Sequence, residues 1–117
     1  MELHTVASAS VFDDHYQMAY LYCFDKQKNY CFSLSRFPSE EEIEIMVSDQ
    51  INHKVTDLSV ELRGGTISVC FDRITATKLD GEMNYQIHIQ DFDDRKTVIL
   101  AALQKIFEGK TGFRFFV

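Results

Sequence analysis

Hydrophobic and polar residues alternate along most of this chain, and a period of two is typical of β-strands. The alternation predicts strands over 3–10, 16–24, 30–36, 42–48, 58–63, 66–71 and 83–90. The segment 49–52 is interpreted as a loop, and the tail 113–117 as either a short edge strand or a packed end. Most of the chain is therefore expected to lie in a sheet.

The second of these segments is apolar on both faces. Tyr20 and Tyr22 lie on one face, and Leu21 and Cys23 lie on the other. A strand with two apolar faces is typical of the centre of a sheet. We therefore expect Tyr20 and Tyr22 in the core, with a role as anchors of a protein interface as the alternative.

The strongest local signal is a β-hairpin over 58–71. Its centre is Gly64-Gly65, a dipeptide suited to tight turns that require positive φ. With these glycines as the loop, Leu62 faces Ile67, and the other apolar residues of the two strands pair on the same face. The sequence therefore predicts both the turn and the register of this hairpin.

The period becomes that of a helix after residue 91. Asp91 is expected to cap this helix, Ile99 and Leu103 lie on its apolar face, and Gly109 is expected to end it. A short helical turn is expected over 74–79. Strands first and the main helix last favour an α+β fold in one domain spanning 1–117. We expect a single, mostly antiparallel sheet of about six or seven strands packed against a C-terminal helix.

The charge of the chain restricts its partners. Its 117 residues include 12 Lys and Arg against 18 Asp and Glu, a net charge of −6. An acidic chain is not attracted to nucleic acid or to an anionic membrane, so we expect direct contact with neither. The charge favours a basic protein partner, although it also keeps a protein soluble. Without a bilayer-spanning run or a signal-peptide pattern, the chain is expected to be cytoplasmic.

Reactive residue types occur without the spacing that catalysis or metal binding needs. The odd number of cysteines, Cys23, Cys31 and Cys70, favours free thiols in a reducing compartment. None of the four histidines lies three or four residues from another, although distant histidines can meet in space. No serine lies in a glycine-flanked elbow. We therefore expect a binding protein rather than an enzyme, with no catalytic residue, metal or cofactor.

Acidic side chains gather in the segments 13–14, 40–44 and 91–94. Helix capping accounts for the last segment. The segment 40–49 combines charge with a strand beside a loop, which suits a binding surface for a basic partner; solvated loops are the alternative. The candidate partner-binding residues are Glu40, Glu41, Glu42, Glu44 and Asp49, followed by Asp13 and Asp14.

Several features between residues 30 and 109 occur in an order that resembles a known family. An aromatic and aliphatic strand over 30–36 ends in Arg36, and a strand with Glu44 leads to Asp49-Gln50. The hairpin over 58–71, the turn Leu79-Asp80-Gly81, the strand Ile87-His88-Ile89 and a helix ending in Ile106-Phe107 follow. This stretch resembles the immunity protein 10 family, which is found beside bacterial polymorphic toxins.

The resemblance implies that the chain neutralises a cognate toxin of a contact-dependent growth inhibition system inside the producing bacterial cell. The implied mechanism is occlusion of the toxin's active site or substrate path. Many such toxins are nucleases with a basic substrate groove, which an acidic inhibitor would complement. The alternatives are a homodimeric structural or assembly module and a small-ligand-binding domain with a pocket between sheet and helix.

Overall fold

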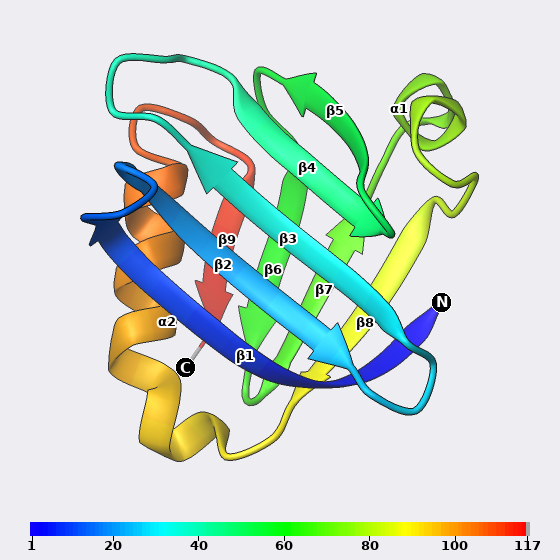
Figure 1. The fold of residues 1–117 in the computed structure, drawn as a ribbon, viewed down its shortest axis with the longest axis horizontal. Coiled ribbons are helices and arrows are strands. Elements are labelled where there is room, and N and C mark those ends of the chain that lie inside the picture. The colour runs from blue at the N-terminus through cyan, green and yellow to red at the C-terminus, as the bar shows by residue number, and fades with distance from the viewer. Residues whose placement is uncertain (117) are drawn as a thin grey trace.

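The computed structural model describes residues 1–116 and contains, within them, one nine-stranded sheet and two helices (Figure 1). The helices are α1 (Arg73–Lys78) and α2 (Phe92–Ile106). The strands are β1 (Glu2–Asp13), β2 (Met18–Asp25), β3 (Tyr30–Arg36), β4 (Ile43–Ser48), β5 (Ile51–Val55), β6 (Ser59–Arg63), β7 (Thr66–Cys70), β8 (Asn84–Ile89) and β9 (Phe113–Phe116).

The α+β class and the mostly antiparallel sheet are as predicted, but the strand count exceeds the six or seven expected. One added strand is β5, which begins at Ile51 and takes the second half of the segment expected as a loop. Ser48 and Gln50 take positive φ values of 55° and 67°, so the chain reverses tightly and β5 pairs with β4. Residues 113–116 of the tail form the other added strand, β9, which lies parallel to β6 at the sheet edge, and residue 117 of that prediction lies outside the described residues.

The sheet folds over itself into two layers. Its strand order is β5-β4-β3-β2-β1-β8-β7-β6-β9, and within it only β1–β8 and β6–β9 are parallel pairs among the described residues. We call β1 to β5 the front layer and β6 to β9 the back layer. The long strand β1 joins them, because its first residues pair with β8 and its later residues pair with β2. In Figure 1 the front layer crosses over the back layer, and α2 lies along one side.

The core lies between the two layers. Phe32 of the front layer lies 5.2 Å from Tyr85 and 6.5 Å from Phe71, measured between ring centroids. Helix α2 adds its predicted apolar face, including Ile99 and Leu103, against β1 and β2. Burial of each such large side chain contributes about 1.5–3 kcal/mol to the free energy of folding.

The hairpin forms as predicted, with Leu62 opposite Ile67 and Arg63 opposite Thr66. The expected cap of α2 is wrong in its mechanism. Asp91 has a left-handed conformation (φ 54°) and makes no side-chain hydrogen bond to the helix. A capping side chain normally acts from a residue with an extended backbone. Asp91 lies in the turn after β8 with a left-handed backbone instead, so its side chain does not cap the helix.

A buried polar network links the two layers. The Tyr30 hydroxyl of β3 and the Tyr85 hydroxyl of β8 lie 2.6 Å apart. Both bond to the carboxylate of Asp80, which follows α1, and the Tyr85 hydroxyl donates to Oδ1 at 2.9 Å. Burial and this shared carboxylate raise the pKa of both tyrosines. Neutral tyrosines thus tie the layers together inside the core.

The remaining expectations concern thiols and membrane segments. All three cysteines have free thiols; Cys23 and Cys31 are buried, and Cys70 is exposed. Burial raises the pKa of the Cys23 thiol to about 12, so this group stays protonated at neutral pH. Within residues 1–116, neither helix has the length and apolar character that crossing a bilayer requires.

Candidate protein-binding surface

The outer face of the front layer alternates large and small side chains across its strands. The sheet register places Tyr20 between Ser10 of β1 and Ser35 of β3. Tyr22 lies between Ser8 and Ser33 in the next row. Serine side chains are too short to fill the space beside a tyrosine ring, so a hollow remains.

This hollow is an open groove of about 380 Å³. We call it the tyrosine groove. It is lined by Ser8, Tyr16, Met18, Tyr20, Tyr22, Ser33, Ser35, Glu44 and Met46.

The expectation that Tyr20 and Tyr22 belong to the core is wrong. The core side of β2 carries Ala19, Leu21 and Cys23, whereas 37% of Tyr22 remains exposed. The physical reason is that the back layer and α2 both cover the same face of the front layer. Among the described residues, those that line the groove come from β1 to β4 and the turn after β1, and none comes from α1 or α2. The alternative, a role as anchors of a protein interface, stays a prediction.

Glu44 is the candidate acidic residue that lies in the groove. It is half-buried on β4, opposite Ser35 of β3 on one side and Lys54 of β5 on the other. Lys54 forms an ion pair with Glu40 at 3.3 Å. Glu44 is therefore the carboxylate that lines the groove, on its β4 side.

The remaining candidates, with one exception, lie at the same end of the front layer as Glu44. Asp13 and Asp14 occupy the turn from β1 to β2, while residues 40–42 belong to the connection from β3 to β4. A second hollow of about 610 Å³ lies between these two connections. We call this end of the layer, with Asp13, Asp14, Glu40, Glu41 and Glu42, the acidic end.

Asp49 is the exception. It lies in the turn from β4 to β5, at the opposite end of β4 from Glu42. The sequence grouped it with residues 40–44 because they are close in the chain. A strand separates its two ends in space, so Asp49 does not join the acidic end.

Arg36 fixes the connection that carries Glu40. Its Nε donates a hydrogen bond to the carbonyl of Glu40 at 2.8 Å. Its Nη1 donates to the carbonyls of Ile106 and Glu108, at 2.9 and 2.8 Å, at the C-terminal end of α2. A cation at a helix C-terminus is also favoured by the helix dipole. The acidic end is therefore anchored to the main helix.

Exposed apolar residues accompany the carboxylates at the acidic end. Phe12 and Phe37 are exposed, and 59% of Tyr16 is exposed. All three line the second hollow, and Tyr16 also lines the tyrosine groove. Exposed apolar area with a polar rim is typical of interaction sites. The sequence analysis did not select these residues, because exposure of an aromatic side chain is decided by the tertiary fold.

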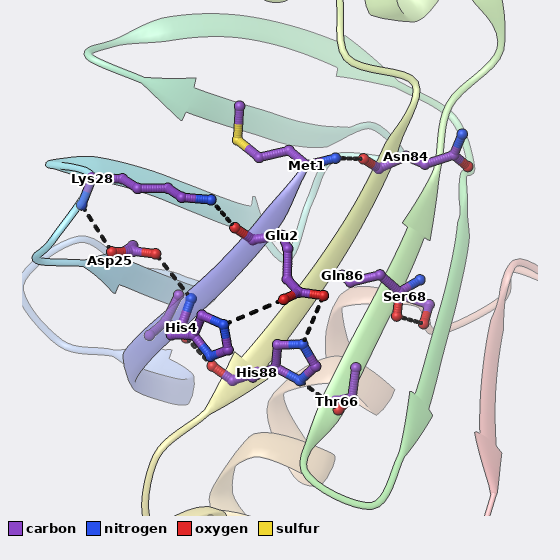
Figure 2. A network of polar contacts seen from close by, with 11 residues as sticks. Met1, Glu2, His4, Asp25, Lys28, Thr66, Ser68, Asn84, Gln86 and His88 are labelled. Atoms are coloured by element: carbon purple, nitrogen blue, oxygen red, sulfur yellow. Dashed lines mark hydrogen bonds and ion pairs between the residues drawn. The ribbon is translucent and has the colours of Figure 1, made fainter.

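Two of the four histidines meet in a separate cluster. His4 and His88 stack with ring centroids 4.8 Å apart, and both lie beside the carboxylate of Glu2 (Figure 2). The neighbouring His88 and His4 hold the pKa of Glu2 below its ordinary value. Within residues 1–116, this is the group of side chains with the geometry to hold a metal ion.

No family model, no curated protein and no solved structure matches this chain. Its function is therefore inferred from its own surface. Tyrosine and methionine side chains offer large contact areas and are enriched in protein interfaces. The tyrosine groove and the acidic end together combine exposed aromatic side chains with carboxylates.

Proposed function

We propose that this chain is an immunity protein that binds and neutralises a cognate bacterial toxin. The observation that carries this proposal is that the exposed aromatic residues of one sheet face adjoin a concentration of carboxylates in the turn and connection at the end of that face. Tyr16 belongs to both parts of that face. The resemblance of residues 30–109 to the immunity protein 10 family supports the same assignment.

Charge supports a basic partner such as a nuclease. The chain has a net charge of −6, and the acidic end concentrates part of it beside the groove. Complementary potentials speed encounter and exclude partners of the wrong charge. A nuclease binds its substrate in a basic cleft, so an inhibitor with this surface would compete with nucleic acid for that cleft. A toxin acting on cytoplasmic nucleic acid requires an inhibitor in the cytoplasm.

The size of the front layer suits such a partner. A standard interface covers about 800 Å² on each protein. Five strands spaced about 4.8 Å apart give a face about 24 Å wide, and seven residues per strand make it about 23 Å long. These dimensions give about 550 Å², about two thirds of the standard area, and the adjoining acidic end adds to it. We therefore assign the tyrosines as anchors and the carboxylates as the steering rim.

Co-purification tests the proposal directly. The tagged chain is expressed together with its genomic neighbours, and the co-eluting proteins are identified. We expect a stoichiometric partner whose toxicity disappears in the presence of this chain. A symmetric dimer or a monomer without a partner would reject the proposal and favour the assembly or ligand-binding alternatives.

Charge reversal then tests the acidic surface. The variant Glu41→Lys/Glu42→Lys/Glu44→Lys is expected to lower the association rate at least about tenfold at low salt. Its matched control reverses Glu61, Glu82 and Asp91, which lie outside the front layer, and changes the net charge equally. Stopped-flow binding measures both variants. Equal rates for the two would show that net charge, and not the acidic surface, steers the partner.

A further inference from the structure

The parallel pairing of β1 with β8 brings together side chains that are far apart in the chain. Its register places His4 opposite His88 and Glu2 opposite Gln86. Residues two apart on a strand share a face, so Glu2, His4 and His88 all lie on the outer side of the sheet. The cluster occupies the point where β1 passes from the back layer to the front layer.

The three functional groups converge. His4 Nε2 lies 3.4 Å from Glu2 Oε1, and His88 Nε2 lies 3.6 Å from Glu2 Oε2. Figure 2 shows both imidazoles directed toward this carboxylate. Their exposed side-chain fractions are 61% for His4 and 38% for His88, and that of Glu2 is 62%. An ion from solvent therefore has open access to all three groups.

Buried polar groups fix the backbone beneath both histidines. The carboxylate of buried Asp25 accepts the backbone N–H of His4 at 2.9 Å. The hydroxyl of buried Thr5 donates to the backbone carbonyl of His88 at 3.0 Å. Apart from tyrosines and cysteines, Thr5 and Asp25 are the buried polar side chains of residues 1–116. Both of them are used to hold this cluster.

Thr66 orients one of the rings. Its hydroxyl lies 3.0 Å from His88 Nδ1, across the β7–β8 pair. A hydrogen bond at Nδ1 keeps Nε2 directed toward Glu2. Histidines that bind metals almost always have such a partner on the second ring nitrogen, since it fixes the tautomer and the ring orientation.

We propose that Glu2, His4 and His88 form a binding site for a divalent transition-metal ion, with Zn²⁺ as the ion that the donor set fits. Two imidazoles and a carboxylate suit Zn²⁺ better than Mg²⁺ or Ca²⁺, which take mostly oxygen ligands. Three protein ligands leave a coordination position for water or an incoming ligand. This inference is independent of the proposed toxin binding.

The distances agree with zinc coordination after a small closure. Tetrahedral bonds of about 2.0–2.1 Å require ligand atoms about 3.3 Å apart. Each imidazole is already close to this distance from one oxygen of the Glu2 carboxylate: His4 Nε2 lies 3.4 Å from Oε1, and His88 Nε2 lies 3.6 Å from Oε2. Taken as one ligand atom from each residue, the three ligand atoms lie within 4.8 Å of one another. His88 is held by Thr66, so closure around the ion would come from rotation of the more exposed Glu2 and His4 side chains.

Isothermal titration of the chain with Zn²⁺ tests the site. The protein carries no histidine tag and is first freed of metal with a chelator. We expect one ion per chain, and the variant His4→Ala/His88→Ala is expected to bind at least about tenfold more weakly. The variant Thr66→Val is expected to lose about tenfold through ring orientation alone. The matched control His15→Ala/His53→Ala removes the two histidines outside the cluster and is expected to bind like the unchanged chain.

NMR spectra of the unchanged chain provide a readout that needs no variant. Zn²⁺ is expected to shift the imidazole signals of His4 and His88 and to leave those of His15 and His53 in place. Equal shifts of all four histidines, binding that survives His4→Ala/His88→Ala, or no saturable binding at submillimolar Zn²⁺ would each overturn the proposal.

Discussion

The front and back layers share one core but differ on their outer faces. On the back layer, polar side chains satisfy one another across strands: Ser68 bonds to Gln86 at 3.0 Å, and Arg114 pairs with Glu61 at 3.2 Å. On the front layer, Tyr22 instead lies between two serines and remains exposed. A face whose groups already pair has little to gain from a partner, whereas an exposed aromatic face gains apolar burial.

The two sites proposed for this molecule also differ from each other in size and chemistry. The tyrosine groove is a broad surface that suits a protein, whereas the Glu2–His4–His88 cluster is a small group of ligands that suits an ion. Both depend on β1, which contributes Ser8 to the groove and two ligands to the cluster. Each site can be tested separately, because no residue is common to both.

The largest expected effect comes from breaking the core that the layers share. Phe32→Ala is expected to lower the free energy of unfolding by about 3–5 kcal/mol, because the cavity lies against Phe71 and Tyr85. Tyr22→Ala, on the neighbouring strand but on the outer face, is expected to cost less than about 1 kcal/mol. Urea unfolding measures both. Similar losses would contradict the assignment of inner and outer faces.

A smaller loss of stability is expected at acid pH, because two carboxylates that accept backbone hydrogen bonds, those of Asp25 and Asp57, become protonated. Backbone hydrogen bonds from His4 and Lys28 hold the pKa of Asp25 below its ordinary value. For Asp57, burial raises the pKa, but hydrogen bonds from Thr111, Leu58 and Gly112 outweigh it and the net direction is downward.

Both groups therefore stabilise the fold above their unfolded pKa of about 3.9, and this stability is lost as pH falls through the lower folded values. Urea midpoints at pH 7, 4 and 3 are expected to decrease in that order. The control Asp25→Asn/Asp57→Asn should start from a lower midpoint and lose less of it with acid. A midpoint that stays constant below pH 4 would contradict this account.

The sequence predicted features that depend on neighbouring residues. The Gly64-Gly65 turn sets the register of β6 and β7, and alternation alone identifies Ile43, Ile45 and Val47 as buried residues of β4. The sequence also contains a sign of the groove: the small residues Ser33 and Ser35 alternate with the buried residues Phe32 and Leu34 on β3.

Features that depend on strand order were not predictable in this way. Tyr20 and Tyr22 lie outside the core because the back layer and α2 both pack on the other face of the front layer. His4 and His88 meet because β1 and β8 pair in parallel, a pairing without a local signal in either segment. Asp49 is close to Glu44 in the chain and far from the acidic end in space, since β4 runs between them.

The most direct test of the central claim is the affinity of the Tyr20→Ser/Tyr22→Ser variant for the co-purified partner, measured by isothermal titration. Anchor residues of an interface contribute at least about 2 kcal/mol, so we predict a loss of about thirtyfold or more. The control Ile74→Ser/Val98→Ser removes exposed apolar residues from α1 and α2 and is predicted to bind normally. Unchanged affinity of the tyrosine variant, in a protein that remains folded, would contradict the account.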